Sequence, residues 1–151
     1  MSCAVARIPA SGLSLMRPWD PSNEGRALRV LESQGLIKLK PEAGILATTQ
    51  DITANPKNLV VKELDAGIVG RSIDDLDAAV VNTDWALKAG LTQNDRIATE
   101  AVDNNPYRNF IAVKAGHEND PWVKTLVGSY ENDTVRATLA KVYKGTALPA
   151  W

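Results

Sequence analysis

The chain has 151 residues, of which 44% are hydrophobic and 23% are charged, a balance typical of a folded globular protein of one ordinary domain. The formal net charge is −1 and the lysines and arginines are scattered, which argues against nucleic acid as a partner. Cys3 is the single cysteine, so no intrachain disulfide can form, and no apolar run approaches the ~20 residues of a membrane span.

Residues 1–19 show no clear hydrophobic period, and proline and glycine interrupt them. We therefore expect an irregular segment there, and it shows no export signal or lipobox. A helix is expected to begin after Asp20, because turn and cap residues precede apolar side chains at helical spacing. Gly35 is expected to end that helix, and residues 36–56 are predicted to be loop-like, with a short helix near residues 49–53.

The middle of the chain alternates predicted strands and helices. Leu59–Leu64 is predicted to be a strand. Ser72, with a carboxylate three residues later, resembles a capping box, so a short helix is expected to start just after it. The apolar run Ala78–Val81 is typical of a strand that is buried on both faces of a parallel sheet, and a helix is expected directly after it.

The C-terminal part is predicted to contain strands at residues 96–102 and 110–114 and helices that start near Asp120 and Asp133. The alternation of strands and helices indicates an α/β fold with a mainly parallel sheet. Each of the last two helices carries an apolar stripe that must pack on the other helix, on a partner chain or on the N-terminal residues. Left unpaired, the stripes would form an exposed patch that favours self-association. The stripes comprise Trp122, Val123, Leu126, Val127 and Tyr130, and then Val135, Leu139 and Val142.

Four polar residues form the candidate binding site, namely Asn23, Arg26, Asn82 and Asn109. The first turn of a helix holds Asn23 and Arg26, and its free N–H groups attract an anion, while the planar arginine fork suits a carboxylate. Asn82 stands at the carboxyl end of a predicted strand, where ligands bind in open α/β sheets. Asn109 begins the strand predicted at residues 110–114. Together these groups suit a zwitterion such as a free amino acid.

Each of these residues also has a structural interpretation. Asn23 and Asn82 can serve only as helix caps, and Arg26 can be an ordinary surface arginine. Asn109 can be a turn residue after Pro106.

The sequence shows no catalytic motif. It lacks a Walker loop, GxSxG, HExxH and CxxC, and it holds one histidine. The densest carboxylate cluster, Asp74, Asp75 and Asp77, fits a solvated first turn of a helix. We therefore predict neither catalytic residues nor a metal site nor a cofactor. A small α/β enzyme is the least favoured function, after the two described below, a solute-binding protein and an interaction module.

Five motifs occur in the order found in the methionine-binding lipoproteins of the NlpA family. Asp20–Leu28 resembles the family's DPSNxGRAL, and Asn55–Leu59 resembles its NPxNL. Arg71–Asn82 resembles RSxDDxDAAxxN, and Asn105–Asn109 resembles SPYxN with asparagine in place of serine. Lys144–Trp151 is similar to the family's C-terminus. The order of the five motifs makes the resemblance more specific than any single one.

The resemblance implies the extracytoplasmic solute-binding component of an ABC amino-acid importer, with a two-lobed periplasmic-binding-protein fold of type 2. L-Methionine or a related amino acid would bind between the lobes and pass to the ABC permease, in the periplasm or at the outer face of the cytoplasmic membrane. The family's polar ligand contacts correspond to Arg26, Asn82 and Asn109, and less closely to Asn23.

The resemblance also implies how the chain is divided. Residues 20–105 are expected to form lobe two, and residues 106–151 to return to an incomplete lobe one as a crossover strand and helices. Residues 1–19 are expected to be unlike the family and the chain to be N-terminally truncated. Binding is then expected to be weakened, because the family's lobe one supplies the wall around the thioether. The alternative is a non-binding interaction module that docks a partner lobe or the permease.

Overall fold

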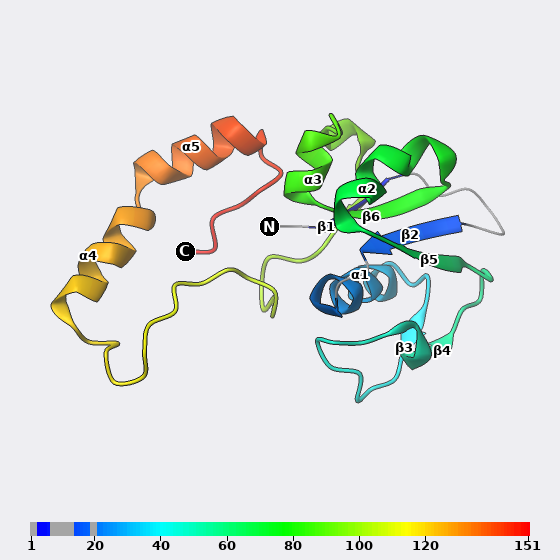
Figure 1. Ribbon diagram of the computed structural model, residues 1–151, viewed down its shortest axis with the longest axis horizontal. Helices are drawn as coiled ribbons and strands as arrows, with labels where there is room; N and C mark the ends of the chain where they lie inside the picture. Colours follow the sequence, from blue (N-terminus) through cyan, green and yellow to red (C-terminus); the bar gives the residue numbers. More distant parts are fainter. Residues whose placement is uncertain (1–2, 7–13, 19–20) are drawn as a thin grey trace.

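The computed structural model describes residues 3–6, 14–18 and 21–151 of the chain. A five-stranded sheet lies at its centre, with strand order β5-β2-β6-β1-β7 (Figure 1). We call β1 and β2 together with residues 21–99 the body of the molecule, and residues 100–151 the C-terminal segment. Among the residues whose burial is described, 23–151, every buried one lies in the body.

The sheet is mixed, whereas the sequence predicted a mainly parallel one. β2 (Ser14–Pro18) runs parallel to β5 (Val60–Leu64) and to β6 (Ala78–Asn82). β1 (Cys3–Ala6) runs antiparallel to β6 and to the two-residue strand β7 (Ala98–Thr99). The α/β class and the buried central strand are both as predicted.

β1 and β2 lie in the segment that was expected to be irregular, and that expectation is wrong for both. Strands of four and five residues are too short to show a reliable alternation in sequence. Their pairing with β6 is a long-range contact, and such contacts override weak local patterns.

Two predicted strands in the later part of the chain are also wrong or overlong. The strand expected at residues 96–102 is reduced to Ala98–Thr99, and residues 110–114 form no regular element. Apolar, β-branched residues favour a strand only where a neighbouring strand supplies hydrogen-bond partners. Residues 110–114 have no such neighbour among the described residues.

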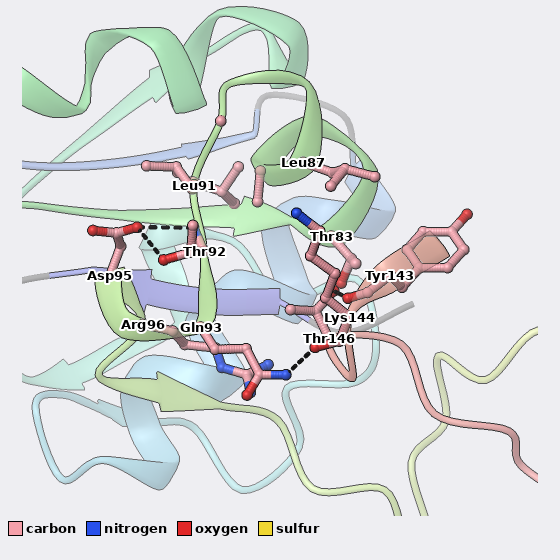
Figure 2. A pocket seen from close by; sticks show the side chains of 13 residues that line it. Thr83, Leu87, Leu91, Thr92, Gln93, Asp95, Arg96, Tyr143, Lys144 and Thr146 are labelled. Carbon is pink, nitrogen blue, oxygen red and sulfur yellow. Dashed lines mark hydrogen bonds between the residues drawn. The ribbon is translucent and has the colours of Figure 1, made fainter. Parts of the chain in front are cut away.

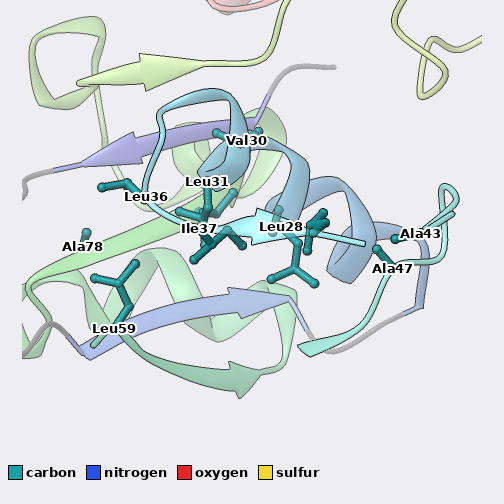
Figure 3. Packing of buried hydrophobic residues seen from close by; sticks show 12 residues of the cluster. Leu28, Val30, Leu31, Leu36, Ile37, Ala43, Ala47, Leu59 and Ala78 are labelled. Carbon is teal, nitrogen blue, oxygen red and sulfur yellow. The ribbon is translucent and has the colours of Figure 1, made fainter. Parts of the chain in front are cut away.

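β6 divides the core into two layers, because successive side chains of a strand point to opposite faces of the sheet. Ala78 and Val80 pack on one face with α1 (Pro21–Ser33). Figure 3 shows Ala78 in this cluster with Val30 and Leu31 of α1. Ala79 and Val81 pack on the other face with Val69 and the partly buried side chains of Trp85 and Ala86. All five residues of β6 are buried, which makes it the strand that the sheet is built around.

Helix α1 anchors the larger layer through four buried residues, Ala27, Leu28, Val30 and Leu31. Burial of a leucine side chain stabilises a fold by about 1.5–3 kcal/mol relative to leaving it exposed. α1 ends as predicted, since Gly35 takes a left-handed conformation with φ of 67°. Residues 36–56 hold a small antiparallel sheet of β3 (Lys38–Leu39) and β4 (Ile52–Ala54), next to the expected short helix η1 (Thr49–Asp51).

The second layer is formed by short helices. α2 (Ala66–Val69) begins after Asp65, whose side chain accepts a hydrogen bond from the Gly67 amide, and it continues into the 3-10 helix η2 (Gly70–Asp75). The capping box predicted at Ser72 is therefore wrong, because Ser72 lies inside η2 and donates to the Ile68 carbonyl. α3 (Thr83–Lys88) follows β6 as predicted, and η3 (Gln93–Asp95) leads into β7.

The C-terminal segment ends in α4 (Pro121–Tyr130) and α5 (Asp133–Tyr143), which lie away from the sheet (Figure 1). Both helices form as predicted, and the side chain of Asn132 caps α5 by accepting a hydrogen bond from the Val135 amide. Neither helix has a buried residue, and Trp122 and Tyr130 of the apolar stripe are 51% and 58% exposed. The stripes therefore remain largely uncovered in the described part of the chain.

Candidate functional site

The first turns of α1 bring Asn23 and Arg26 to one face of the helix, because residues three apart are neighbours on a helix surface. Pro21 occupies the first helical position, where its missing N–H costs nothing. Gly25 lies between Asn23 and Arg26 in the sequence and is buried. A Cβ atom built there would collide with the Ile45 carbonyl oxygen and lie 2.9 Å from the Ala47 amide nitrogen, so α1 fits closely against this loop.

Asn82 is buried, with 7% of its surface exposed, at the carboxyl end of β6. It occupies the N-cap position of α3, but its side chain makes no capping hydrogen bond. Instead its Nδ2 donates to Oδ1 of Asn23 over 2.6 Å. The interpretation of Asn82 as only a helix cap is therefore wrong, and the structure brings Asn23 and Asn82 together across 59 residues of sequence.

The other side-chain atom of Asn82, Oδ1, is a buried acceptor that no described hydrogen-bond donor reaches. Leaving such an acceptor unsatisfied costs a protein about 1–3 kcal/mol. Most buried polar groups have partners, so an exception of this kind calls for a physical reason. A donor that arrives with a ligand would supply the missing partner.

Arg26 is also buried, with 6% of its surface exposed, so it is not an ordinary surface arginine. Its Nε donates to Oε2 of Glu100 over 2.8 Å, and its Nη2 donates to Oε1 of the same carboxylate. The Tyr107 ring centroid lies 5.6 Å from the guanidinium carbon, close enough for a cation–π interaction. The guanidinium is thus fixed in place by a two-point ion pair and an aromatic ring.

Arg26, Glu100 and Tyr107 line a cavity of about 360 Å³ between α1 and the first part of the C-terminal segment. The sequence analysis missed Glu100 and Tyr107 as site residues. Tyr107 belongs to the motif that contains Asn109, which was the available signal. Glu100 lies in the strand predicted at residues 96–102, where nothing marks it as a site residue. Its cationic partner Arg26 is 74 residues away, and sequence spacing does not reveal a contact over that separation.

Asn109 is exposed and lies outside any regular element, so the prediction that it begins a strand is wrong. The described hydrogen bonds join Asn23 to Asn82, and the described ion pair joins Arg26 to Glu100. Neither of these contacts involves Asn109. Three of the four candidate residues are therefore adjacent, and no hydrogen bond described here joins Asn109 to them.

A second cavity, of about 180 Å³, lies between α3, η3 and the end of α5 (Figure 2). Leu87 and Leu91 form part of its apolar wall, and Gln93 donates a hydrogen bond from Nε2 to the Lys144 carbonyl oxygen. The pKa of Tyr143 is raised above its ordinary value by a hydrogen bond to Asp84 and by the negative charge of that residue. These two contacts attach the end of α5 to the body.

Within the residues that the structure describes, no three histidine, cysteine or acidic side chains are grouped so that they could hold a metal ion. Across the same residues, no helix has both the length and the apolar character needed to cross a membrane.

Comparison with known proteins places this chain in a family. Residues 5–151 match the model of the NlpA lipoproteins. The chain belongs to the NlpA lipoprotein family. The match begins at residue 5, so the expectation that the first 19 residues are unlike the family is wrong for most of them, in agreement with the strands found there.

One relative within this family is the D-methionine-binding lipoprotein MetQ of Salmonella typhimurium. It is 41% identical over 143 residues, which cover 93% of this chain and 52% of that protein. The chain thus spans about half the length of this curated relative, and the same holds for Outer membrane lipoprotein 1 of Mannheimia haemolytica, of which 51% is covered.

Solved structures of related proteins show the same fold. A nutrient binding protein from Burkholderia cenocepacia bound to methionine matches 99% of this chain and 66% of its own chain, with a TM-score of 0.83 and 42% identity. A periplasmic substrate-binding protein of an ABC transporter from Coxiella burnetii matches 98% and 65%, with a TM-score of 0.83 and 38% identity. The predicted periplasmic-binding-protein fold of this NlpA-family chain is therefore confirmed.

Proposed function

We propose that the chain provides the polar part of an amino-acid binding cleft in the extracytoplasmic receptor of an ABC importer, with L-methionine or a related amino acid as ligand. The observation that carries this proposal is the unsatisfied Oδ1 of Asn82. It is buried next to Asn23, and Asn23 lies one turn of α1 before Arg26. The relatives that are named as methionine-binding proteins support the choice of ligand.

The charges of the cluster suit a free amino acid. Arg26 is held rigidly, and a preorganised guanidinium binds a carboxylate at little cost in side-chain freedom. The ligand ammonium group carries three donors, and one of them can meet Asn82 Oδ1. Asn109 is proposed to join these contacts from the C-terminal segment when ligand is present.

The proposal includes a division of the chain. Residues 20–105 form the second lobe and residues 106–151 return to the first lobe, so that the cleft lies between them. The largely uncovered α4 and α5 agree with this division, because helices of a lobe that is mostly supplied by other residues would have nothing to pack on here. The proposed location is the periplasm or the outer face of the cytoplasmic membrane, with the ABC permease as partner.

A thermal-shift experiment tests the proposal, because a ligand that binds only the native state raises the apparent melting temperature. L-Methionine, D-methionine and the other amino acids are each added to the purified chain. Methionine should raise the melting temperature, and Asn82→Ala should abolish most of that rise. Asn94→Ala, which changes an exposed asparagine of η3, is the matched control and should keep it. A rise with methionine that survives Asn82→Ala would contradict the site.

A second candidate function is a non-binding interaction module, and the exposed faces of α4 and α5 are the observation that favours it. In this case the chain docks a separate lobe or the permease through these faces, or self-associates through them. Light scattering distinguishes the two functions. A protein that stays monomeric at high concentration and shows no binding of a hydrophobic dye would argue against the docking function.

A further inference from the structure

Glu100 follows β7 and turns its carboxylate toward α1, where it forms the two-point ion pair with Arg26. The two side chains are 7% and 10% exposed, so the pair is almost entirely removed from water. Both residues line the cavity of about 360 Å³. A cation and an anion are thus fixed side by side at the edge of a space that can hold a small molecule.

Stability alone is a weak reason for a buried ion pair. Removing two charges from water offsets most of their mutual attraction, and apolar side chains of similar volume are often as stable. The pair has a second consequence, which is that the charges of Arg26 and Glu100 cancel. An arginine that is paired in this way favours a ligand with a net negative charge less than an isolated buried arginine would.

We propose that Glu100 determines which class of ligand this site accepts. Its carboxylate receives the α-ammonium group of the ligand, while Arg26 receives the α-carboxylate. The ion pair thereby selects α-amino acids over carboxylic acids that lack an amino group. This inference rests on the proposed function.

The geometry of an α-amino acid matches that of the ion pair. A single carbon atom separates the ammonium group from the carboxylate, and the two charges of the protein are also adjacent, with 2.8 Å between Nε of Arg26 and Oε2 of Glu100. The ligand can therefore lie with its charges opposite to those of the protein. Asn82 Oδ1 lies next to Asn23, outside the residues that line this cavity, and is proposed as a further neutral acceptor for an ammonium proton at the first turn of α1.

An acid without an amino group meets a different environment. Its carboxylate can still reach Arg26, but it then lies next to the Glu100 carboxylate and brings no ammonium group of its own to face that carboxylate. Asn82 Oδ1 also stays without a donor. Both effects weaken the binding of such an acid relative to methionine.

Calorimetry with two ligands tests this inference. L-Methionine and 4-(methylthio)butanoate have the same carboxylate and thioether and differ only in the amino group. The wild-type chain should bind methionine more tightly by about tenfold or more, as expected for one charge-assisted hydrogen bond. Glu100→Gln should reduce this ratio to a few-fold at most, and Glu100→Asp should keep part of it because it retains the anion.

The ratio of the two affinities is the decisive readout, because a partly unfolded sample lowers both affinities by the same factor. Glu42→Gln alters an exposed glutamate and is the matched control, for which the ratio should not change. An unchanged ratio in Glu100→Gln, with methionine still bound, would overturn the role of Glu100 and leave the proposed function standing. Failure of the wild-type chain to bind methionine would overturn both.

Discussion

The body and the C-terminal segment of this chain have similar hydrophobic patterns but differ in what those patterns bury. In the body, α1 places Leu28 and Leu31 against β6, and both side chains are fully buried. In the C-terminal segment, α4 and α5 carry apolar stripes of the same period, yet neither helix has a buried residue. A helical period therefore predicts that a helix forms, and it does not show that its apolar face is covered within the same chain.

The candidate site residues follow the same division. The body supplies Asn23, Arg26 and Asn82 from rigid elements, whereas the C-terminal segment supplies Glu100, Tyr107 and, by proposal, Asn109. Binding sites are held more accurately by helices and strands than by loops. The body is thus expected to keep its part of the site in place, and the C-terminal segment is expected to be the part that moves.

The largest predicted difference between the two regions concerns truncation of a leucine. Leu31→Ala in α1 should lower the free energy of unfolding by about 2–5 kcal/mol, because it leaves a cavity in a fully packed layer. Leu139→Ala in α5 is the matched change, and its side chain is only partly buried. It should cost less than about 1 kcal/mol. Urea denaturation measures both values, and similar losses would show that α5 belongs to the same cooperative unit as the body.

Smaller changes in stability are expected when a helical glycine is replaced by alanine in each region. The two changes should have opposite signs. Gly25→Ala should destabilise the chain by about 1–3 kcal/mol, because the new Cβ collides with the backbone of the Ile45–Ala47 loop. Gly128 in α4 has nothing within 4 Å of its built Cβ atom. Gly128→Ala should therefore stabilise α4 by about 0.5–1 kcal/mol through helix propensity alone.

Far-ultraviolet circular dichroism and urea denaturation together separate these two effects. Gly25→Ala is expected to shift the cooperative transition of the body to lower urea. Gly128→Ala is expected to raise the helical signal with little change in that transition. A loss of stability in Gly128→Ala would mean that α4 packs against something that the structure does not show.

The smallest effect concerns the contact that joins the two regions. Asp84→Asn should lower the pKa of Tyr143 toward its ordinary value of 10.0, because it removes the negative charge and weakens the hydrogen bond that raises this pKa. A raised pKa means that the neutral phenol is the favoured form in the folded chain. The contribution of the Tyr143–Asp84 hydrogen bond to the attachment of α5 is therefore complete below pH 10, and it is lost as the pH rises through the raised pKa of Tyr143.

Nuclear magnetic resonance of ring-labelled tyrosine follows this titration. The three tyrosines are assigned with the help of Tyr143→Phe. Asp74→Asn, which changes an exposed aspartate of η2, should leave the pKa of Tyr143 unchanged. A pKa that also stays unchanged in Asp84→Asn would show that α5 is not held to α3 by this contact.

Sequence reasoning succeeded where local pattern and environment agree. α1, β5, β6, α3, α4 and α5 were predicted because each carries a clear period or a run that ends at a recognisable residue. β1, β2 and β7 were missed or misjudged in extent, because two to five residues hold too little pattern and the strands depend on partners far along the chain.

The site shows the same limit. Arg26 and Asn82 were predicted from helix-start chemistry and from the end of a buried strand, and they lie in one cluster with Asn23. The ion pair of Arg26 with Glu100 could not be predicted, because it spans 74 residues and no local spacing encodes it. The clustering is therefore a property of the fold, which the family resemblance anticipated better than the residue pattern did.

The most direct test of the account is a titration of the ¹⁵N-labelled chain with L-methionine, followed by nuclear magnetic resonance. The account predicts that the largest changes occur at the backbone and side-chain amides of Asn23 and Asn82 and at the guanidinium of Arg26, while the amides of α4 and α5 change little. Changes confined to α4 and α5, or no change at saturating methionine, would contradict the claim that this chain carries the polar anchors of an amino-acid site.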